Sequence, residues 1–269
     1  NSFYFMDQYA EMEYKRIGLI DYKLSSIGLG TYGITDYDRA EEAFLYAIER
    51  GVNLIDTAEI YNTEDFVGRI VKKAGRENLF ITTKIWPNHL GSRESVLKSA
   101  RASLKRMGIA SADLMLIHWP NNSISIEEQV RNFEAVITEG LTTYIGVSNF
   151  SVKQMDIARQ TVTKAEIVCN QVEYNLSNRS AEADVIPYCQ KNRMAVIAYT
   201  PIEKGRPSVP KEVVQRTGKT PIQIALRFIS MKDNVIPIPK AGRIDHVKEI
   251  LGSVGWKLRD EDIADLAGS

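Results

Sequence analysis

Four side chains in the first half of the sequence are of types that could together protonate a carbonyl oxygen: Asp56, Tyr61, Lys84 and His118. A free phenol has a pKa of about 10 and is a weak acid at neutral pH. A lysine ammonium about 4 Å away would favour the phenolate by roughly 4 kcal/mol at an effective dielectric constant of 20, about three pKa units, and burial would offset part of this. Asp56 can keep Lys84 charged, and His118 can hydrogen-bond a carbonyl oxygen. The set therefore suits the reduction of a carbonyl group.

The same residues fit other kinds of site less well. One histidine and one carboxylate are too few ligands for a metal ion, so no metal is expected. The set also lacks a nucleophilic serine or cysteine with an adjacent base. A Schiff-base aldolase that uses Lys84 is a weaker alternative, because a lysine paired with Asp56 stays protonated and is a poor nucleophile.

Three of these residues directly follow short apolar runs of the kind that buried strands show. Strands expected over residues 52–55, 79–83 and 113–117 lead into Asp56, Lys84 and His118. Five further strands are expected over residues 26–29, 142–147, 167–170, 195–198 and 235–239. They lead into the glycine-rich stretch 28–33 and then into Ser148-Asn149, Gln171, Tyr199 and Lys240. Polar or aromatic residues thus follow successive strands along the chain.

Helical periodicity separates these strands. Helices are expected from Asp38, around residues 67–74, after a cap at Ser92, over about 126–138, 152–160 and 181–191, after a cap at Thr220, and from near Asp245. Short strands that alternate with amphipathic helices form a parallel sheet covered by helices. Eight such units predict an α/β fold, a (β/α)8 TIM barrel with its active site at the carboxyl ends of the strands.

A short N-terminal β-hairpin is expected before the barrel, with strands over residues 15–20 and 23–25 that flank a turn at Asp21–Tyr22. No linker or low-complexity segment divides the remaining chain. We therefore expect a single barrel domain over residues 12–269. Residues 1–11 are expected to be an N-terminal extension that is partly non-native.

The composition excludes several classes of protein. The 269 residues are 44% hydrophobic and 25% charged, as in ordinary globular proteins. Lys+Arg and Asp+Glu both total 34, so neither nucleic acid nor an anionic membrane is an expected partner. The sequence lacks an apolar run of the roughly 20 residues that a membrane span needs, and the first residues lack the pattern of a signal peptide. Two cysteines do not form a disulfide framework, which indicates a reducing, cytoplasmic location.

The chain resembles an aldo-keto reductase along nearly its whole length, from about Met12 to the last helix. The resemblance rests on motifs that are individually weak but specific in this order: Gly28-Leu-Gly-Thr-Tyr32, Asp56-Thr-Ala-Glu-Ile-Tyr61, Thr83-Lys84, His118-Trp-Pro120, Gly146-Val-Ser-Asn-Phe150, Asn170-Gln171, Tyr199-Thr-Pro201 and Ile238-Pro-Lys240. It implies an oxidoreductase that transfers hydride from NADPH to an aldehyde or ketone. Asp56, Tyr61, Lys84 and His118 would be the catalytic tetrad, with Tyr61 as the general acid.

The resemblance also implies where cofactor and substrate bind. The nicotinamide would stack on Tyr199, with its carboxamide held by Ser148, Asn149 and Gln171. The other implied cofactor contacts are Gly30, Thr31, Tyr32, Asp56, Thr200, Pro201, Ile202, Lys240, Ala241, Gly242, Arg243, His246 and Glu249. The carbonyl substrate, a small molecule, would contact Tyr32, Trp86, His118 and Trp119. A monomer or weak homo-oligomer is expected.

The sequence departs from the commonest pattern of this family at the expected cofactor phosphate site. His246 stands where many members have an arginine, and Ile250 replaces an asparagine often found beside the adenine. Lys240 and Arg243 remain as cations, so NADPH should be preferred over NADH, though less strongly. The family also includes cofactor-binding, redox-responsive regulatory subunits. The complete tetrad and the absence of an appended segment weigh against that alternative.

Overall fold

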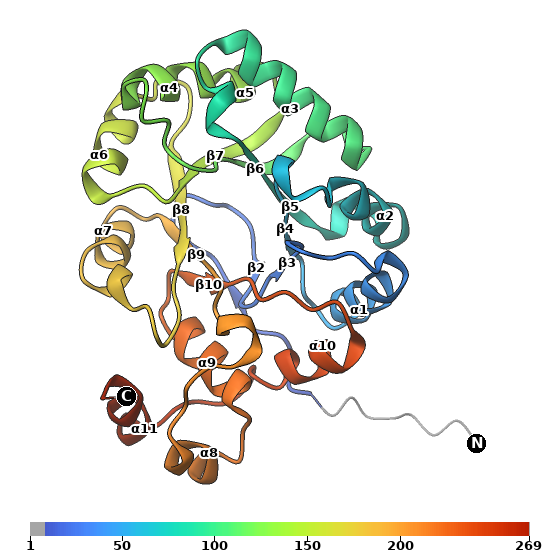
Figure 1. The fold of residues 1–269 in the computed structure, drawn as a ribbon, viewed down its shortest axis with the longest axis vertical. Coiled ribbons are helices and arrows are strands. Elements are labelled where there is room, and N and C mark those ends of the chain that lie inside the picture. The colour runs from blue at the N-terminus through green and yellow to red at the C-terminus, as the bar shows by residue number, and fades with distance from the viewer. Residues whose placement is uncertain (1–8, 269) are drawn as a thin grey trace.

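Eight parallel strands form one sheet that curls around the centre of the molecule, in a computed structural model that describes residues 9–268 (Figure 1). The strands run in chain order: β3 (Leu29–Gly30), β4 (Leu54–Asp56), β5 (Phe80–Ile85), β6 (Ala112–Ile117), β7 (Thr142–Ser148), β8 (Ile167–Glu173), β9 (Ala195–Tyr199) and β10 (Val235–Pro237). Two backbone hydrogen bonds join the first and last strands and close the barrel. Gly28 N–H donates to Pro237 O, and Gly30 N–H donates to Pro239 O, both at 3.0 Å. The predicted (β/α)8 barrel is confirmed.

Helices surround this sheet (Figure 1). They are α1 (Tyr37–Glu49), α2 (Glu64–Ala74), α3 (Arg93–Met107), α4 (Ile126–Phe133), α5 (Ala135–Thr138), α6 (Val152–Thr161), α7 (Val185–Lys191), α8 (Lys211–Thr217), α9 (Pro221–Ser230), α10 (Ile244–Leu251) and α11 (Asp260–Ala267). Both predicted caps are confirmed: the hydroxyl of Ser92 accepts from Ser95 N–H at 3.1 Å, and Thr220 forms a capping box with Gln223. Within residues 9–268, no helix has the length and hydrophobicity that a membrane span needs.

Two predicted helices differ from the observed ones. The helix expected over residues 126–138 is broken at Glu134, whose buried carboxylate accepts hydrogen bonds from the backbone N–H groups of residues 163–165. The helix expected from residue 181 begins at Val185, after a 3-10 turn over Ser180–Glu182. Helix α8 was not predicted. Only Val213 of α8 is buried, so its sequence has no apolar stripe to reveal it.

The strand side chains alternate between two cores. Leu54, Phe80 and Leu116 belong to a cluster inside the barrel. Their chain neighbours Ile55 and Ile81 belong to the larger cluster between the sheet and the helices. Successive side chains of a strand point to opposite faces, so strands such as β4 and β5 supply both cores.

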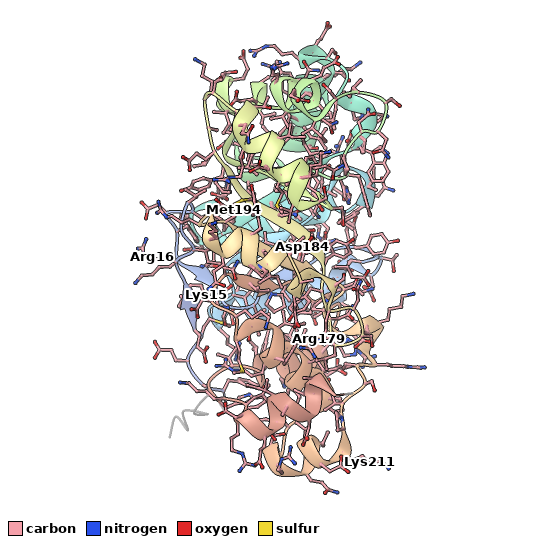
Figure 2. All side chains as sticks on the ribbon, turned by 90° about the vertical axis from the view of Figure 1, so that its left-hand side faces the viewer. Lys15, Arg16, Arg179, Asp184, Met194 and Lys211 are labelled. Carbon is pink, nitrogen blue, oxygen red and sulfur yellow. The ribbon has the colours of Figure 1, made fainter. Side chains whose placement is uncertain are left out.

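The N-terminal hairpin closes the end of the barrel where the strands begin. Strands β1 (Tyr14–Lys15) and β2 (Leu24–Ser25) pair antiparallel, which confirms the hairpin, but the strand expected over residues 15–20 and the tight turn at residues 21–22 are wrong. Residues 16–23 form a longer loop because Ile17 and Ile20 turn inward and pack in the cluster inside the barrel. Lys15 and Arg16 of this hairpin region are labelled at the left of Figure 2. Of the extension predicted over residues 1–11, residues 1–8 lie outside the described residues.

Lys15 ties the hairpin to the last βα unit. Its ammonium donates to three backbone carbonyl oxygens, those of Ser230 at 2.5 Å, Lys232 at 2.8 Å and Val235 at 2.7 Å. Ser230 is the last residue of α9, where helix geometry leaves a carbonyl without an intrahelical donor. Lys232 O lies in the turn between α9 and β10 and also accepts from Val235 N–H at 3.1 Å. One side chain thus satisfies three acceptors and fixes the hairpin beside β10.

We expect Lys15→Met to lower the free energy of unfolding by about 2–3 kcal/mol, because it removes three hydrogen bonds of a charged donor to partly buried carbonyl oxygens. Urea denaturation of both proteins measures the difference. Lys23→Met, at an exposed position of the same hairpin, is the matched control and should change the value by less than about 0.5 kcal/mol. Equal effects of the two substitutions would show that the three hydrogen bonds contribute nothing specific.

Candidate active site

A buried ion pair joins two neighbouring strands at the centre of the candidate site. Lys84 Nζ in β5 lies 2.6 Å from Asp56 Oδ1 at the end of β4, and the two residues are 0% and 2% exposed. Lys84 also donates to Thr57 O at 3.0 Å. The second carboxylate oxygen of Asp56 accepts from Gln171 Nε2 at 2.8 Å. Both charged groups therefore have several partners although they are removed from water.

Lys84 is held as an ammonium. Burial acts to lower its pKa, but the carboxylate of Asp56 and the phenol of Tyr61 outweigh burial, so the pKa of Lys84 is raised above its usual value. A protonated amine has no free electron pair with which to attack a carbonyl carbon. This arrangement therefore disfavours Schiff-base chemistry at Lys84.

Tyr61 reaches the ion pair from a 3-10 turn, η1 (Glu59–Tyr61), that follows β4. Lys84 Nζ donates to its hydroxyl at 3.2 Å. Burial raises the pKa of Tyr61, the Lys84 ammonium lowers it and Asp56 raises it, with a net result above the ordinary value. Burial thus outweighs the ammonium, contrary to the net lowering expected from Lys84. The phenol stays protonated at neutral pH and has a proton to donate.

His118, at the exit of β6, lies between two aromatic rings. Its ring centre is 5.5 Å from that of Tyr61 and 5.1 Å from that of Trp86, and both contacts are edge to face. The residue is 7% exposed, and within residues 9–268 its Nδ1 has no hydrogen-bond partner. Burial and, to a lesser extent, Lys84 lower the pKa of His118 to about 3. The imidazole is therefore neutral and can donate one N–H.

The residues expected to hold a carboxamide form one hydrogen-bonded row. Tyr199 donates its hydroxyl to Asn149 Oδ1 at 2.7 Å, and Asn149 Nδ2 donates to Ser148 Oγ at 3.1 Å. Ser148 in turn donates to Gln171 O at 2.8 Å. Because the side chain of Gln171 binds Asp56, this row is continuous with the buried ion pair.

The exit of β3 flanks the same group. Thr31 Oγ1 donates to Asp56 O at 3.0 Å, and the ring of Tyr32 lies 5.2 Å from that of Tyr61. Gly30 is bridged to Lys240 across the seam of the barrel. Tyr32 and Trp119 are 70% and 44% exposed, so they stand at the rim of the site.

The segment expected to hold a cofactor phosphate lies at the exit of β10. Lys240, Arg243 and His246 are exposed, Gly242 and Glu249 are half-buried, and Ala241 is buried. Arg243 is engaged in a two-point ion pair with Asp245, at 3.0 Å and 3.2 Å. Of the remaining residues expected to contact the cofactor in the loop after β9, Pro201 is buried, Ile202 is half-buried and Thr200 is exposed.

Sequence reasoning missed two features of this end of the barrel. Thr63 bridges the hydroxyls of Thr31 and Thr57, at 2.8 Å and 3.0 Å. Strained backbone conformations are also found at the strand exits. Four residues other than glycine have positive φ angles there: Asn149, Thr200, Glu203 and Lys204. Such strain persists only where the surroundings impose it, and it often marks functional sites. An asparagine directly after a strand was the only sequence signal of it.

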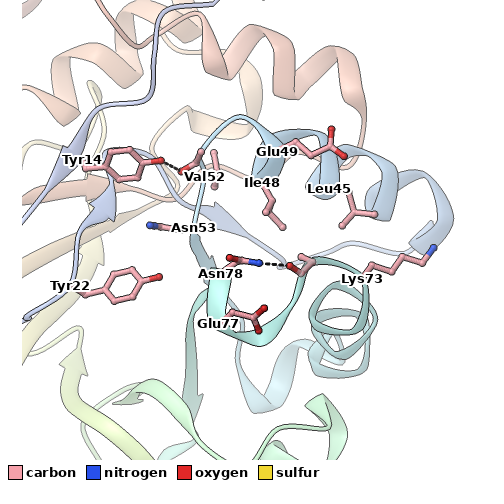
Figure 3. A pocket seen from close by; sticks show the side chains of 12 residues that line it. Tyr14, Tyr22, Leu45, Ile48, Glu49, Val52, Asn53, Lys73, Glu77 and Asn78 are labelled. Carbon is pink, nitrogen blue, oxygen red and sulfur yellow. Dashed lines mark hydrogen bonds between the residues drawn. The ribbon is translucent and has the colours of Figure 1, made fainter.

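A hollow of about 530 Å³ lies at the opposite end of the molecule, between the hairpin and the ends of α1 and α2 (Figure 3). Tyr14, Tyr22, Glu49 and Glu77 line it. No residue of the candidate site borders this hollow. Among residues 9–268, no three His, Cys, Asp or Glu side chains are grouped so as to hold a metal ion.

The depressed pKa of His118 makes stability depend on pH. The unfolded chain binds a proton at this residue below about pH 6.5, whereas the folded protein does not until about pH 3, so stability falls as the pH falls through this window. We expect His118 to lower the free energy of unfolding by about 2 kcal/mol between pH 8 and pH 5. Urea denaturation of wild type and His118→Gln at both pH values tests this.

The variant should lose less stability than wild type over that range, by about the same 2 kcal/mol. His246→Gln, at an exposed position, is the matched control and should keep the pH dependence of wild type. The burial argument fails if His118→Gln and wild type lose equal stability.

Comparisons with known proteins agree with this geometry. The model of the aldo/keto reductase family matches residues 26–209. The methylglyoxal reductase YeaE of Escherichia coli (strain K12) is 31% identical over 259 residues, which cover 91% of this chain and 90% of that protein.

Solved structures extend the similarity to the whole fold. A thermostable aldo-keto reductase crystallised with the inhibitor epalrestat is 39% identical with a TM-score of 0.88, covering 96% of this chain and 99% of that chain. An aldo/keto reductase from Klebsiella pneumoniae in complex with NADP and acetate is 28% identical with a TM-score of 0.87, covering 95% and 94%. The chain belongs to the aldo/keto reductase family.

Proposed function

We propose that this protein reduces an aldehyde or ketone with hydride from NADPH, and oxidises the corresponding alcohol in the reverse direction. The hydrogen bond from Lys84 to Tyr61, beside a neutral His118, is the observation that carries the proposal. The similarity to a methylglyoxal reductase and to a structure in complex with NADP supports it. In formal terms the activity is that of an NADP-dependent oxidoreductase acting on the CH–OH group of donors.

Each member of the tetrad has a distinct role in this proposal. NADPH, when bound, supplies the hydride. Tyr61 donates its phenolic proton to the carbonyl oxygen as negative charge develops there, and Lys84 stabilises the phenolate that remains. His118 donates an N–H to the same oxygen and orients it. Asp56 keeps Lys84 protonated in its buried position.

The chain's own residues fit the cofactor's groups. The amides of Asn149 and Gln171 and the hydroxyl of Ser148 can complement a carboxamide, and the ring of Tyr199 offers a flat face beside them. Gly30, Thr31 and Tyr32 would border the cofactor at the exit of β3, and Thr200, Pro201 and Ile202 at that of β9. Lys240 and Arg243 would meet the 2′-phosphate, with Ala241, Gly242, His246 and Glu249 around the adenosine.

Two other activities receive less support. A Schiff-base aldolase needs an unprotonated Lys84, whereas the ion pair keeps its ammonium. A redox-responsive regulatory subunit needs no general acid, whereas Tyr61 is in hydrogen-bond contact with Lys84. The loss of NADPH absorbance at 340 nm tests whether the protein is an enzyme. The substrates to assay are methylglyoxal, small sugars, aromatic aldehydes and ketones. No turnover with any of these substrates would favour the regulatory subunit.

Other properties are part of the same proposal. We take residues 12–269 as a single domain that acts as a monomer or weak homo-oligomer in the cytoplasm. Cys169 and Cys189 are buried and free, which suits a reducing compartment. The equal numbers of basic and acidic residues argue against nucleic acid as a partner.

Tyr61→Phe should lower kcat by at least about 100-fold, because it removes only the proton that the carbonyl oxygen needs. The Kd for NADPH, measured by quenching of protein fluorescence, should change little. Tyr22→Phe, at the opposite end of the barrel, is the matched control and should leave kcat unchanged. Retention of most of kcat in Tyr61→Phe would reject Tyr61 as the acid.

The ion pair between Arg243 and Asp245 bears on cofactor choice, because the guanidinium must be shared with or released to a phosphate. Arg243→Ala should raise the KM for NADPH about tenfold, the loss of one charge-assisted contact, and leave the KM for NADH nearly unchanged. Asp245→Asn frees Arg243 and should lower the KM for NADPH. Steady-state kinetics with both cofactors measure these changes. Equal or better use of NADH by the wild type would contradict the assignment of this segment.

A further inference from the structure

Glu59 holds a second loop of the barrel against the tetrad. One oxygen of its carboxylate, Oε1, lies 2.9 Å from His89 Nε2, and the other, Oε2, accepts from the backbone N–H of Trp86 at 3.2 Å. Trp86 follows β5 directly, and His89 ends the 3-10 turn η3 (Pro87–His89). One half-buried carboxylate therefore fixes both ends of the segment 86–89.

Glu59 and Tyr61 stand at the two ends of the same 3-10 turn, η1. Tyr61 and Trp86, which Glu59 anchors, both pack edge to face with the His118 ring. The turn η1 thus reaches His118 twice, directly through Tyr61 and indirectly through Glu59 and Trp86. The turn is three residues long and is closed by a hydrogen bond from Tyr61 N–H to Ala58 O at 3.1 Å, so it links the two contacts through a short stretch of backbone.

The rest of the segment is anchored by the loop after β6 and by helices α3 and α4. Asn121 Nδ2 donates to Pro87 O at 2.9 Å, and Asn132 Nδ2 donates to Leu90 O at 2.8 Å. Ser95 Oγ lies 3.4 Å from His89 Nδ1. These contacts hold residues 87–90, but Trp86 itself is tied by its N–H to Glu59. Loss of Glu59 should therefore release Trp86 first.

We propose that Glu59 and His89 form a clamp that positions Trp86 against His118 and thereby sets the affinity for the carbonyl substrate. Glu59 and His89 are positioning residues in this proposal, because they act through Trp86. It rests on the proposed function in so far as Trp86 borders the bound carbonyl compound. The clamp should affect the KM for the aldehyde and leave kcat and NADPH binding almost unchanged.

Kinetics of three variants test the clamp with methylglyoxal and benzaldehyde. Glu59→Ala removes both contacts and should raise the KM for each aldehyde about fivefold, the effect of roughly one hydrogen bond, with kcat within about twofold of wild type. Glu59→Gln keeps an acceptor for Trp86 N–H and a polar partner for His89, so it should restore most of the KM. Glu94→Ala, at an exposed position at the start of α3, is the matched control and should resemble wild type.

A spectroscopic readout makes the test independent of turnover. In a Trp119→Phe/Trp256→Phe background, Trp86 is the sole tryptophan of the three in the sequence. Glu59→Ala should then make its fluorescence more accessible to acrylamide, and Glu59→Gln should not. His89→Ala, which removes one arm of the clamp, should give a smaller increase and serves as the main variant if Glu59→Ala does not fold.

The outcomes separate the clamp from the proposed reaction. If wild type fails to oxidise NADPH with any carbonyl compound, the proposed function is wrong, but the quenching measurement still decides whether Glu59 fixes Trp86. Wild-type KM and wild-type quenching in Glu59→Ala would overturn the clamp. A fall in kcat with unchanged KM would also overturn it, because that result would place Glu59 in the chemical step.

Discussion

The ion pair between Lys84 and Asp56 is the interaction on which the rest of the site depends. Moving two charges out of water costs several kcal/mol each, and only well-placed partners compensate for this. Here the partners come from three places in the chain: Thr57 beside the pair, Tyr61 from the turn after β4, and Gln171 from β8. Residues from distant strands must therefore already be in place when the pair is buried. The site and the closed barrel stabilise each other.

Much of this arrangement follows from the sequence because a parallel barrel imposes it. Short apolar runs mark the strands, and the residues after them must gather at one end. Asp56, Lys84 and His118 were placed together on that basis alone. Tyr61 was included because its phenol lies five residues after Asp56 along the chain, and the resemblance to a family implied the same role as general acid. The contact between Gln171 and Asp56 depends on how β8 faces β4 across the barrel, which a one-dimensional pattern does not encode.

The errors share a physical cause, which is that tertiary contacts override local preference. The sequence pattern predicts a strand that includes Ile17 and Ile20, but these residues lie in a loop because their side chains are buried inside the barrel. Glu134 sits within a helical pattern, yet its carboxylate binds the turn before β8 and the helix is broken there. The pKa of Tyr61 was misjudged for a similar reason: the charge of Lys84 is visible in the sequence, whereas the degree of burial is not.

The three hydrogen bonds of Lys15 also bear on the order in which the protein can assemble during its synthesis. Their acceptors lie 215, 217 and 220 residues further along the chain. A ribosome that adds about 5–20 residues per second needs roughly 10–40 s to reach them. During that interval the hairpin has no partner in β10, and the seam between β3 and β10 stays open. The nascent chain must therefore carry an unclosed sheet, with a free edge on β3, until its last strand leaves the ribosome.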